Sequence, residues 1–378
     1  MSNIQMVDLK TQYNRLKPDI DKAIFEVIES TDFIQGQPVR DFTKALSTYL
    51  NVKHVIPCAN GTDALQIALM GLGLKAGDEI ITPSFTYFAT VEVLALLGLK
   101  PVFCEVNEDT FTIDPSQIES LITPKTKAIV PVHLYGQSAQ MDEIMAIATK
   151  HQLYVIEDDA QAIGGKYTSK NGESKHNGTI GDIGCTSFFP SKNLGCYGDG
   201  GAIFTNQDDL AEKLRMIANH GQKKKYIHEL VGCNSRLDTL QAAILNVKLP
   251  HLDDFCQRRR KVAEQYNAFF ASNENIITPK EADYSYHVYH QYTMKLVGVD
   301  RDRVKEALAN VGIPSMIYYP IPTHKQKVIQ SLYDHQIEMP LTEALTKQVL
   351  SLPIHTEMQA SDVEHIANTF LQIINSLK

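Results

Sequence analysis

Two spacings of apolar residues alternate along most of the chain. Short apolar runs bounded by turn residues are typical of buried strands, and segments with apolar residues every three or four positions are typical of helices. The runs predicted as strands are 54–58, 79–82, 101–105, 128–132, 154–157, 184–189 and 201–205. The helices predicted before and between them are 20–29, 39–49, 64–72, 89–97, 115–121, 141–151 and 210–219. Repeated strand-then-helix order predicts an α/β protein with a mostly parallel sheet covered on both faces.

The pattern changes in the last third of the chain. The elements predicted there are helices at 237–256, with a break at Pro250, 259–270 and 301–311, and one strand at 286–296. A length of 378 residues exceeds that of one typical domain. We therefore expect a large domain over residues 1–255, whose N-terminal helices are free to pack on the other domain, and a smaller C-terminal domain over residues 256–378.

Composition narrows the class of protein. The sequence is 43% hydrophobic and 21% charged, which is ordinary for a globular protein, and its formal net charge of -8 argues against nucleic-acid binding. The N-terminus lacks the apolar core of a signal peptide, and no apolar run approaches membrane-spanning length. The six cysteines contain no CxxC pair, which favours reduced thiols over a metal site or disulfides. We expect a cytoplasmic protein without a bound metal.

A lysine occupies an unusual loop between two of the predicted strands. Lys192 lies in a glycine-rich stretch, 190–201, and its neighbours include Phe188, Phe189 and Tyr197. A loop lysine is usually a solvated surface charge. A lysine desolvated by aromatic and small residues instead loses proton affinity and can become a nucleophilic amine.

Three consecutive acids, Glu157, Asp158 and Asp159, lie at the end of the predicted strand at 154–157. The sequence there is VIEDDAQ, so the acids and Gln161 fall at the carboxyl end of a strand, where open α/β sheets bind ligands. A reactive lysine together with a carboxylate that can face a pyridinium nitrogen is what pyridoxal phosphate requires. The sequence therefore indicates a site for this cofactor.

An anion site is predicted where an early strand turns into a helix. Gly61, Thr62 and Asp63 open the helix, and free N–H groups at a helix start favour a phosphate group. The expected ligands are the backbone of these three residues and the Thr62 hydroxyl. The alternative is that Thr62 or Asp63 merely caps the helix, and the two roles are compatible.

Seven segments resemble motifs of one family, and they occur in that family's order. They are CANGTDAL at 58–65, ITPSFTYFAT at 81–90, PVHLYG at 131–136, VIEDDAQ at 155–161, FFPSKNLGCYGDGGAIFTN at 188–206, NSRLDTLQAAIL at 234–245 and YYPIPTHKQ at 318–326. The chain resembles the DegT/DnrJ/EryC1/StrS family of nucleotide-sugar aminotransferases, and its C-3 branch best. The resemblance implies fold type I: a large domain with a mostly parallel, seven-stranded mixed sheet and a smaller C-terminal α+β domain.

The same resemblance assigns catalytic and cofactor-binding roles. Lys192 would hold pyridoxal phosphate covalently, Asp158 would face the pyridinium nitrogen, and Gln161 would reach the phenolic oxygen. Asp158 is chosen because relatives place an acid three residues before this glutamine. Asp159 stands where relatives have a small residue, and its side chain is expected on the other face of the strand end. Ser187 would be a second phosphate ligand, and Tyr87 would stack on the cofactor ring.

Further residues are assigned to the substrate and to a neighbouring subunit. Asn234 would bind the cofactor phosphate of the neighbouring subunit, so each site of a homodimer would be shared. The residues implied for substrate binding are Arg236, Tyr318, Tyr319 and His133. Each has an ordinary alternative: Asn234 or Ser235 could cap a helix, the tyrosine pair could be core, and a lone buried histidine is more often structural.

The resemblance implies the transfer of an amino group from L-glutamate to a keto group of a UDP- or dTDP-linked sugar. A 3-keto sugar is expected, giving an amino sugar for a cell-surface polysaccharide such as the lipopolysaccharide O-antigen. Tyr318 departs from this branch, where relatives often carry histidine. The alternatives are amination at C-4 and a non-catalytic regulator on the same fold. A sugar dehydratase is disfavoured, because those relatives replace the lysine by histidine.

Overall fold

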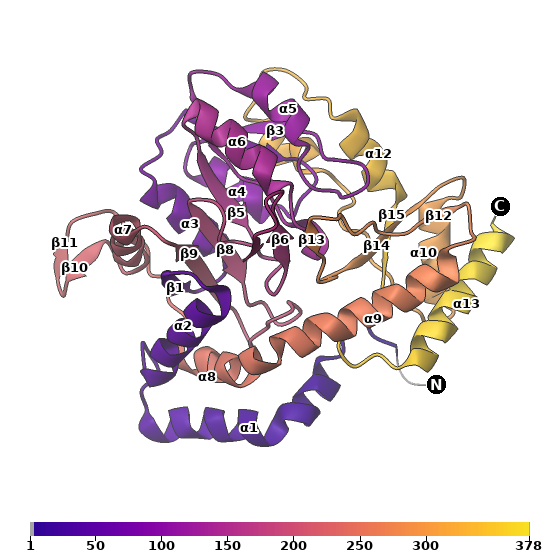
Figure 1. Cartoon of the computed structure of the whole chain (residues 1–378), viewed down its shortest axis with the longest axis horizontal. Coiled ribbons are helices and arrows are strands. Elements are labelled where there is room, and N and C mark those ends of the chain that lie inside the picture. The colour runs from indigo at the N-terminus through magenta and orange to yellow at the C-terminus, as the bar shows by residue number, and fades with distance from the viewer. Residues whose placement is uncertain (1–3, 378) are drawn as a thin grey trace.

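A seven-stranded sheet lies at the centre of the molecule, in a computed structural model that describes residues 4–377. Its strand order is β1-β9-β8-β5-β4-β2-β3 (Figure 1). The strands are β1 (His54–Cys58), β2 (Glu79–Pro83), β3 (Lys100–Cys104), β4 (Thr126–Ile129), β5 (Tyr154–Asp158), β8 (Ile183–Ser187) and β9 (Gly201–Thr205). The strands from β8 to β3 pair in parallel, whereas β9 is antiparallel to β1 and β8. The predicted mixed, mostly parallel sheet is confirmed.

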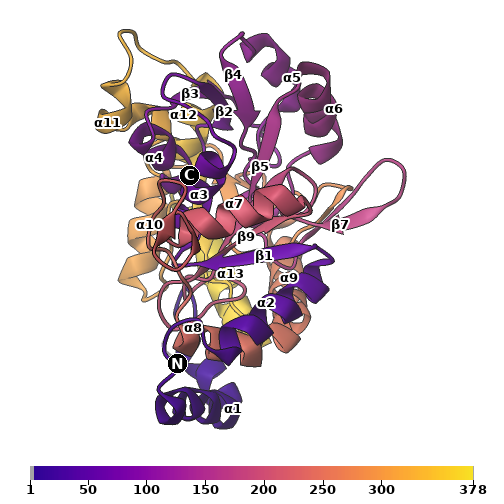
Figure 2. The ribbon, with the colours of Figure 1, turned by 90° about the vertical axis from the view of Figure 1, so that its left-hand side faces the viewer.

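Helices cover both faces of this sheet because successive strand side chains point to opposite faces. Ile56 packs in an apolar cluster with α3 (Gly61–Gly71) and α7 (Asp208–Ala218), whereas its neighbour Val55 packs with α2 (Gln37–Leu50) and α8 (Thr239–Lys248). Figures 1 and 2 show α2 and α8 on the opposite side of β1 from α7. The remaining elements around the sheet are α4 (Ala89–Leu96), α5 (Pro115–Ile118), α6 (Met141–His151), β6 (Lys166–Thr168), β7 (Ser174–His176), β10 (Gln222–Lys224) and β11 (Ile227–His228).

Long helices connect the sheet to the C-terminal domain. α1 (Leu9–Ser30) packs on α8, and the side chain of Gln12 near its start donates to Thr356 Oγ1 at 3.2 Å. α9 (Leu252–Phe270) follows the predicted break at Pro250 and runs to α13 (Ala360–Ser376) in the C-terminal domain (Figure 1). The predicted boundary between residues 255 and 256 falls within α9, and it stays a prediction.

The C-terminal domain has its own small sheet and core. Its sheet order is β12-β14-β15, and its core includes Tyr266, Phe270, Tyr292 and Phe370. The elements are β12 (Ile276–Ile277), β14 (Tyr292–Leu296), α10 (Arg301–Asn310), α11 (Lys327–Gln330), α12 (Pro340–Gln348) and β15 (Val349–Leu352). Within residues 4–377, no helix is both long and apolar enough to cross a membrane.

The prediction of one continuous strand at 286–296 is wrong. β13 (Ser285–Tyr286) pairs with β6, and β14 belongs to the separate C-terminal sheet. Between them the backbone of Tyr289 has a φ of 44°, and the buried Arg259 side chain donates to the carbonyls of Tyr289 and His290. The chain therefore turns between two sheets where the residue pattern alone resembled one strand.

The carboxyl ends of the parallel strands meet the starts of two helices at one edge of the sheet. β5 ends at Asp158, β8 ends at Ser187, and α3 begins at Gly61 directly after β1. α4 begins at Ala89, after the loop that follows β2. Residues far apart in the sequence are thus gathered at the edge where ligands of open α/β sheets bind.

Candidate active site

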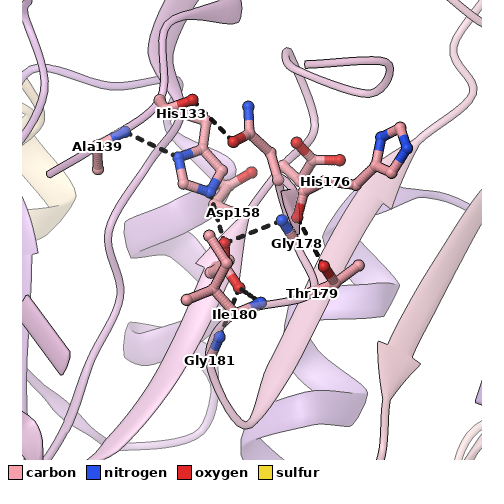
Figure 3. Close-up of polar contacts among 12 residues, drawn as sticks. His133, Ala139, Asp158, His176, Gly178, Thr179, Ile180 and Gly181 are labelled. Atoms are coloured by element: carbon pink, nitrogen blue, oxygen red, sulfur yellow. Dashed lines mark hydrogen bonds and ion pairs between the residues drawn. The ribbon is translucent and has the colours of Figure 1, made fainter. Parts of the chain in front are cut away.

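Three consecutive acids at the end of β5 lie in three different surroundings. Glu157 is fully buried and accepts four hydrogen bonds (Figure 3). The donors are His133 Nε2 at 2.8 Å and the backbone N–H groups of Gly178, Ile180 and Gly181 at 2.9, 2.7 and 2.7 Å. A buried carboxyl group with this many donors is held in a fixed position. Glu157 therefore joins β5 to the loop before β8.

His133 belongs to the same buried cluster. Its side chain is 0% exposed, its Nδ1 accepts from the backbone N–H of Ala139 at 3.0 Å, and its Nε2 faces Glu157 (Figure 3). Because a backbone N–H can only donate, Nδ1 is the acceptor and Nε2 carries the proton. Both ring nitrogens are engaged, so His133 offers no group to a substrate. The structure favours the structural alternative for this residue over substrate binding.

Asp158 points toward the helix that follows the β2 loop. Its Oδ2 accepts from Thr90 Oγ1 at 2.8 Å, and its Oδ1 accepts from the backbone N–H of Ala160 at 3.2 Å. Burial raises the pKa of Asp158, and these two hydrogen bonds and the charge of Lys192 act in the opposite direction. A cation placed beside this carboxylate would favour its ionised form. Thr90, which lies in the segment ITPSFTYFAT, is a supporting residue that the sequence analysis missed.

Asp159 is the acid without support. Its side chain is 0% exposed, and neither carboxyl oxygen has a hydrogen-bond partner among residues 4–377. It lies against Gly178, where an added Cβ would come 3.2 Å from the Asp159 Cβ, rather than toward Thr90. Burial, followed by the charges of Glu157 and Asp158, raises the pKa of Asp159 well above its ordinary value. Asp159 therefore favours its neutral form more strongly than an ordinary aspartate does.

The loop between β8 and β9 is closed by its own backbone. The N–H of Lys192 donates to Phe189 O at 2.8 Å, and the N–H of Cys196 donates to Phe188 O at 2.8 Å. The side chain of Lys192 is partly exposed, and its amine has no hydrogen-bond partner in the described part of the chain. Burial lowers the pKa of Lys192 to about 8, although the charges of Asp158 and Asp159 raise it. A substantial fraction of this amine is neutral, and so nucleophilic, slightly above neutral pH.

The predicted anion site lies at the start of α3. Asn60 is the capping residue, because its Oδ1 accepts from the backbone N–H of Asp63 at 2.8 Å. The alternative that Thr62 or Asp63 caps the helix is therefore wrong, and the Asp63 amide is already engaged. The N–H groups of Gly61 and Thr62 have no acceptor within residues 4–377. A Cβ added to Gly61 would lie 2.8 Å from Ser187 Cβ, so the serine lies directly against these two donors.

Aromatic rings and a glutamine form a third group at this edge. Gln161 Oε1 accepts from the backbone N–H of Tyr135 at 2.8 Å, and its Nε2 donates to Tyr319 Oη at 2.8 Å. The Tyr319 ring centroid is 6.0 Å from that of Tyr87 and 5.7 Å from that of Tyr318. Tyr87 is 59% exposed, so its ring is accessible to a ligand. One N–H of Gln161 remains for a ligand, while the other fixes the Tyr319 hydroxyl.

Asn234 and Arg236 flank a residue that contacts the start of the anion site. Ser235 Oγ accepts from the backbone N–H of Ala59 at 3.0 Å. Asn234 is exposed, and Arg236 lines a groove beside β1. Within residues 4–377 neither side chain makes a hydrogen bond or ion pair. A single chain therefore leaves both side chains free.

One more residue near the lysine was not found from the sequence. His290 is 5% exposed, and its Nδ1 has no partner among the described residues. Burial, followed by the nearby charges of Lys192 and Arg259, holds the pKa of His290 well below its ordinary value. No local pattern marks this residue, since it follows the unexpected turn at Tyr289.

These groups fit pyridoxal phosphate. Lys192 supplies an amine of lowered pKa for the aldehyde, and Asp158 supplies a buried carboxylate for the ring nitrogen. The two free N–H groups at the start of α3, with the adjacent Ser187 hydroxyl, suit the phosphate. The donor set therefore matches the aldehyde, the ring nitrogen and the phosphate of the cofactor.

Comparisons with known proteins agree with this chemistry. A model of the DegT/DnrJ/EryC1/StrS aminotransferase family matches residues 14–371. The chain is 48% identical to the pleiotropic regulatory protein of Geobacillus stearothermophilus, over 96% of each chain. It is 45% identical to the UDP-2-acetamido-2-deoxy-3-oxo-D-glucuronate aminotransferase of Pseudomonas aeruginosa, over 96% of this chain and 98% of that one.

A solved structure extends the likeness to the fold. The crystal structure of NtdA from Bacillus subtilis, which has the bound cofactor PMP, superposes with a TM-score of 0.91. The two sequences are 33% identical, and the match covers 99% of this chain and 86% of that one. The similarity includes both the large domain with its seven-stranded sheet and the smaller C-terminal domain.

Proposed function

The chain belongs to the DegT/DnrJ/EryC1/StrS aminotransferase family and is a pyridoxal-phosphate-dependent aminotransferase; from this premise we propose that it transfers the amino group of L-glutamate to the 3-keto group of a UDP- or dTDP-linked sugar. The observation that supports this substrate most is the 45% identity to an enzyme named for a 3-oxo UDP-sugar. The product is an amino sugar, and we place its use in the synthesis of a cell-surface glycan.

The protein would bind the cofactor at its two ends. The N–H groups of Gly61 and Thr62 and the Ser187 hydroxyl bind the phosphate, while the Asp158 carboxylate holds the proton on the ring nitrogen. Tyr87 covers one face of the ring. Bound pyridoxal phosphate supplies an electron sink that makes a proton on the amino-bearing carbon removable.

Lys192 is the group that moves the proton. With a pKa of about 8, its amine accepts a proton from Cα of the amino donor and can give it up again at neighbouring carbons of the reacting molecule. In the second half of the reaction, Lys192 delivers a proton to the sugar carbon that receives the amino group. The pKa of Asp159 is raised well above its ordinary value, whereas two hydrogen-bond donors favour the ionised form of Asp158.

Two other functions remain to be separated from this one. Amination at C-4 uses the same residues, and the name of the Geobacillus relative raises a regulatory role without catalysis. Purified protein loaded with pyridoxal phosphate should be incubated with L-glutamate and either UDP-3-keto-N-acetylglucosamine or dTDP-4-keto-6-deoxyglucose. We expect an amino sugar and 2-oxoglutarate from the 3-keto sugar, detected by mass spectrometry.

The Lys192→Ala variant is the control for this assay. If only the 4-keto sugar is converted, the enzyme aminates C-4 and the proposed 3-keto substrate is wrong. Absence of 2-oxoglutarate with every keto sugar and with glutamate alone would favour the regulatory alternative.

We also propose a homodimer in which Asn234 and Arg236 serve the site of the partner. Both side chains are free in a single chain and lie near the start of the anion site, which supports this role. Mixing Lys192→Ala with a double variant, Asn234→Ala and Arg236→Ala, should restore activity through one intact site in each mixed dimer. Activity that stays absent despite demonstrated subunit exchange would contradict the shared site.

A further inference from the structure

A buried network joins the loop after β2 to the segment before α11, although these lie about 240 positions apart in the sequence. The backbone N–H and the hydroxyl of Thr323 both donate to Ser84 O, at 3.1 and 3.0 Å. The backbone N–H of His324 donates to Ser84 Oγ at 3.1 Å, and His324 Nδ1 lies 2.6 Å from the same oxygen. His324 Nε2 lies 3.1 Å from Glu343 Oε1 on α12.

The protonation of Glu343 and His324 determines which atom donates in each hydrogen bond of this network. Hydrogen bonds, above all from Lys325, lower the pKa of Glu343 to about 2, so this carboxylate accepts. Burial lowers the pKa of His324, so the ring is neutral and its single proton lies on Nε2, toward Glu343. Nδ1 must then accept the Ser84 hydroxyl proton. Every side-chain polar atom of Ser84 and His324 therefore has a partner, and the side-chain hydrogen bonds have only one set of proton positions.

A serine, a histidine and a carboxylate in this order also occur in hydrolases as a nucleophilic triad. Here Ser84 is 0% exposed and His324 is 1% exposed, so no substrate carbonyl can reach the hydroxyl. The network is therefore not a catalytic centre. Its hydrogen bonds instead connect the large domain with the C-terminal segment.

The two connected segments carry the aromatic rings of the site. Ser84 lies three residues before Tyr87, and His324 lies five residues after Tyr319. The two tyrosine rings approach to 6.0 Å, and Gln161 holds the Tyr319 hydroxyl from the end of β5. Ser84 and Gln161 thus hold the C-terminal segment on either side of the tyrosine pair, and two further contacts add to them: Tyr135 Oη donates to Tyr318 O, and the backbone of Met316 pairs with Ser351.

We propose that Ser84 and His324 are positioning residues that set the separation of the Tyr87 and Tyr319 rings and thereby the width of the sugar-binding side of the site. This inference rests on the proposed function for the identity of the ligand, and on the structure alone for the connection. Loss of the Ser84 hydroxyl should loosen the 318–326 segment and weaken binding of a UDP-sugar. It should leave the reaction with glutamate nearly unchanged, because that smaller substrate does not span the two rings.

A matched control exists in the C-terminal sheet. Ser351 is also 0% exposed, and its hydroxyl lies 2.8 Å from Thr293 Oγ1. Ser84→Ala and Ser351→Ala therefore each remove one buried, hydrogen-bonded hydroxyl, but only the first belongs to the network. His324→Gln, alone and combined with Ser84→Ala, completes a double-mutant cycle.

The first measurement needs neither cofactor nor substrate. Amide hydrogen exchange of the cofactor-free protein should be about tenfold faster in peptides covering 318–326 for Ser84→Ala. It should be unchanged there for Ser351→Ala, whose backbone pairs with Met316, just before these peptides. Equal exchange in the two variants would overturn the connection itself, whatever the protein's substrate.

The second measurement uses the loaded enzyme and UDP-N-acetylglucosamine as a non-reacting probe. Ser84→Ala should weaken its binding about fivefold, with the single-turnover rate with glutamate within about twofold of wild type. The double variant should lose no more affinity for the probe than the single variant with the larger loss. An equal loss in probe binding and in the rate with glutamate would overturn the positioning role. So would losses of binding in the two single variants that add up in the double variant. If wild type fails to bind this probe and dTDP-glucose, the proposed substrate class fails, while the exchange result still decides the connection.

Discussion

Two lysine amines of lowered pKa lie at the loop of residues 190–200, and their surroundings differ. Lys248, on α8, is 1% exposed, and its Nζ donates to Gly195 O at 2.7 Å and lies 4.6 Å from the centroid of the Tyr197 ring. Lys192, within the loop, leaves its amine without a hydrogen-bond partner among residues 4–377. Burial lowers the pKa of both lysines to about 8.

The comparison shows that a lowered pKa alone does not mark a reactive lysine. Both amines are desolvated to a similar extent, but the Lys248 amine is occupied in holding the loop, and no carboxylate contributes to its pKa. The Lys192 amine faces the charges of Asp158 and Asp159 and is free to react. A buried amine without a partner, opposite a carboxylate, is the better indicator of chemistry.

The largest expected difference between the two lysines is in the reaction with glutamate. Lys192→Ala should lower the single-turnover rate to below about one ten-thousandth of wild type, because both the covalent attachment and the proton transfer are lost. Lys248→Met should stay within about tenfold of wild type, because it removes only a support of the loop. Formation of 2-oxoglutarate measures both. A larger loss in Lys248→Met than in Lys192→Ala would reverse the comparison.

The next effect concerns the acids that face Lys192. Asp158→Asn should slow the same reaction about a hundredfold or more, because a neutral amide cannot hold a proton on the ring nitrogen. Asp159→Asn should change the rate less than about threefold, because Asp159 lies against Gly178 and burial already disfavours its charged form. Rapid-mixing absorbance gives both rates. The opposite order would mean that Asp159, rather than Asp158, faces the cofactor.

The lowered pKa of Lys248 should make the free energy of unfolding depend on pH. Below pH 8 this lysine is protonated in both the folded and the unfolded chain, whereas between about 8 and 10.5 only the unfolded chain keeps the proton. Wild-type stability should therefore rise with pH across this window relative to Lys248→Met. A shift from 10.5 to about 8 corresponds to at most about 3 kcal/mol.

Urea unfolding of the cofactor-free proteins at pH 7.5 and at about pH 10 tests this expectation. Lys295→Met is a contrasting control, because Lys295 is 3% exposed and its Nζ also donates to a backbone carbonyl, that of Glu108, at 3.2 Å, but it pairs in addition with Glu108 Oε1 at 2.9 Å. A stability difference between wild type and Lys248→Met that does not change with pH would show that this amine keeps its charge in the folded protein.

The smallest expected effect is that of Thr90→Val. The substitution removes the hydroxyl that donates to Asp158 and keeps the shape of the side chain, so the rate with glutamate should fall about fivefold. Since this hydrogen bond lowers the pKa of Asp158, the acid limb of the pH profile should move to higher pH. A pH profile identical to that of wild type would show that Thr90 does not tune the carboxylate.

The pattern of apolar residues along the chain predicted the strands of the large domain well. The strands of the seven-stranded sheet were placed within three residues of their observed ends, because each buried strand is a short apolar run between turn signals. The strand predicted at 286–296 was wrong because the turn at Tyr289 depends on carbonyl contacts with Arg259, thirty positions away. Contacts of this kind leave no periodic signal.

The candidate site was predictable to a similar degree. Lys192, Asp158 and the start of α3 lie at one edge of the sheet. The alternation of strands and helices and the glycine-rich loop around Lys192 were enough to predict this. The hydrogen bonds of Gln161 to Tyr135 and Tyr319, and the contact of Ser84 with His324, join distant segments. Only the folded chain reveals them. The roles of these residues toward the cofactor stay predictions.

Chemical capture of the cofactor is the most direct test of the account. The holoenzyme should be reduced with sodium borohydride, digested and mapped by mass spectrometry, with Lys248→Met treated in parallel. We expect the mass of the reduced cofactor on the peptide that contains Lys192, in both wild type and Lys248→Met. Cofactor attached to Lys248, or to any lysine other than Lys192, would contradict the claim that the free amine of this loop is the reactive one.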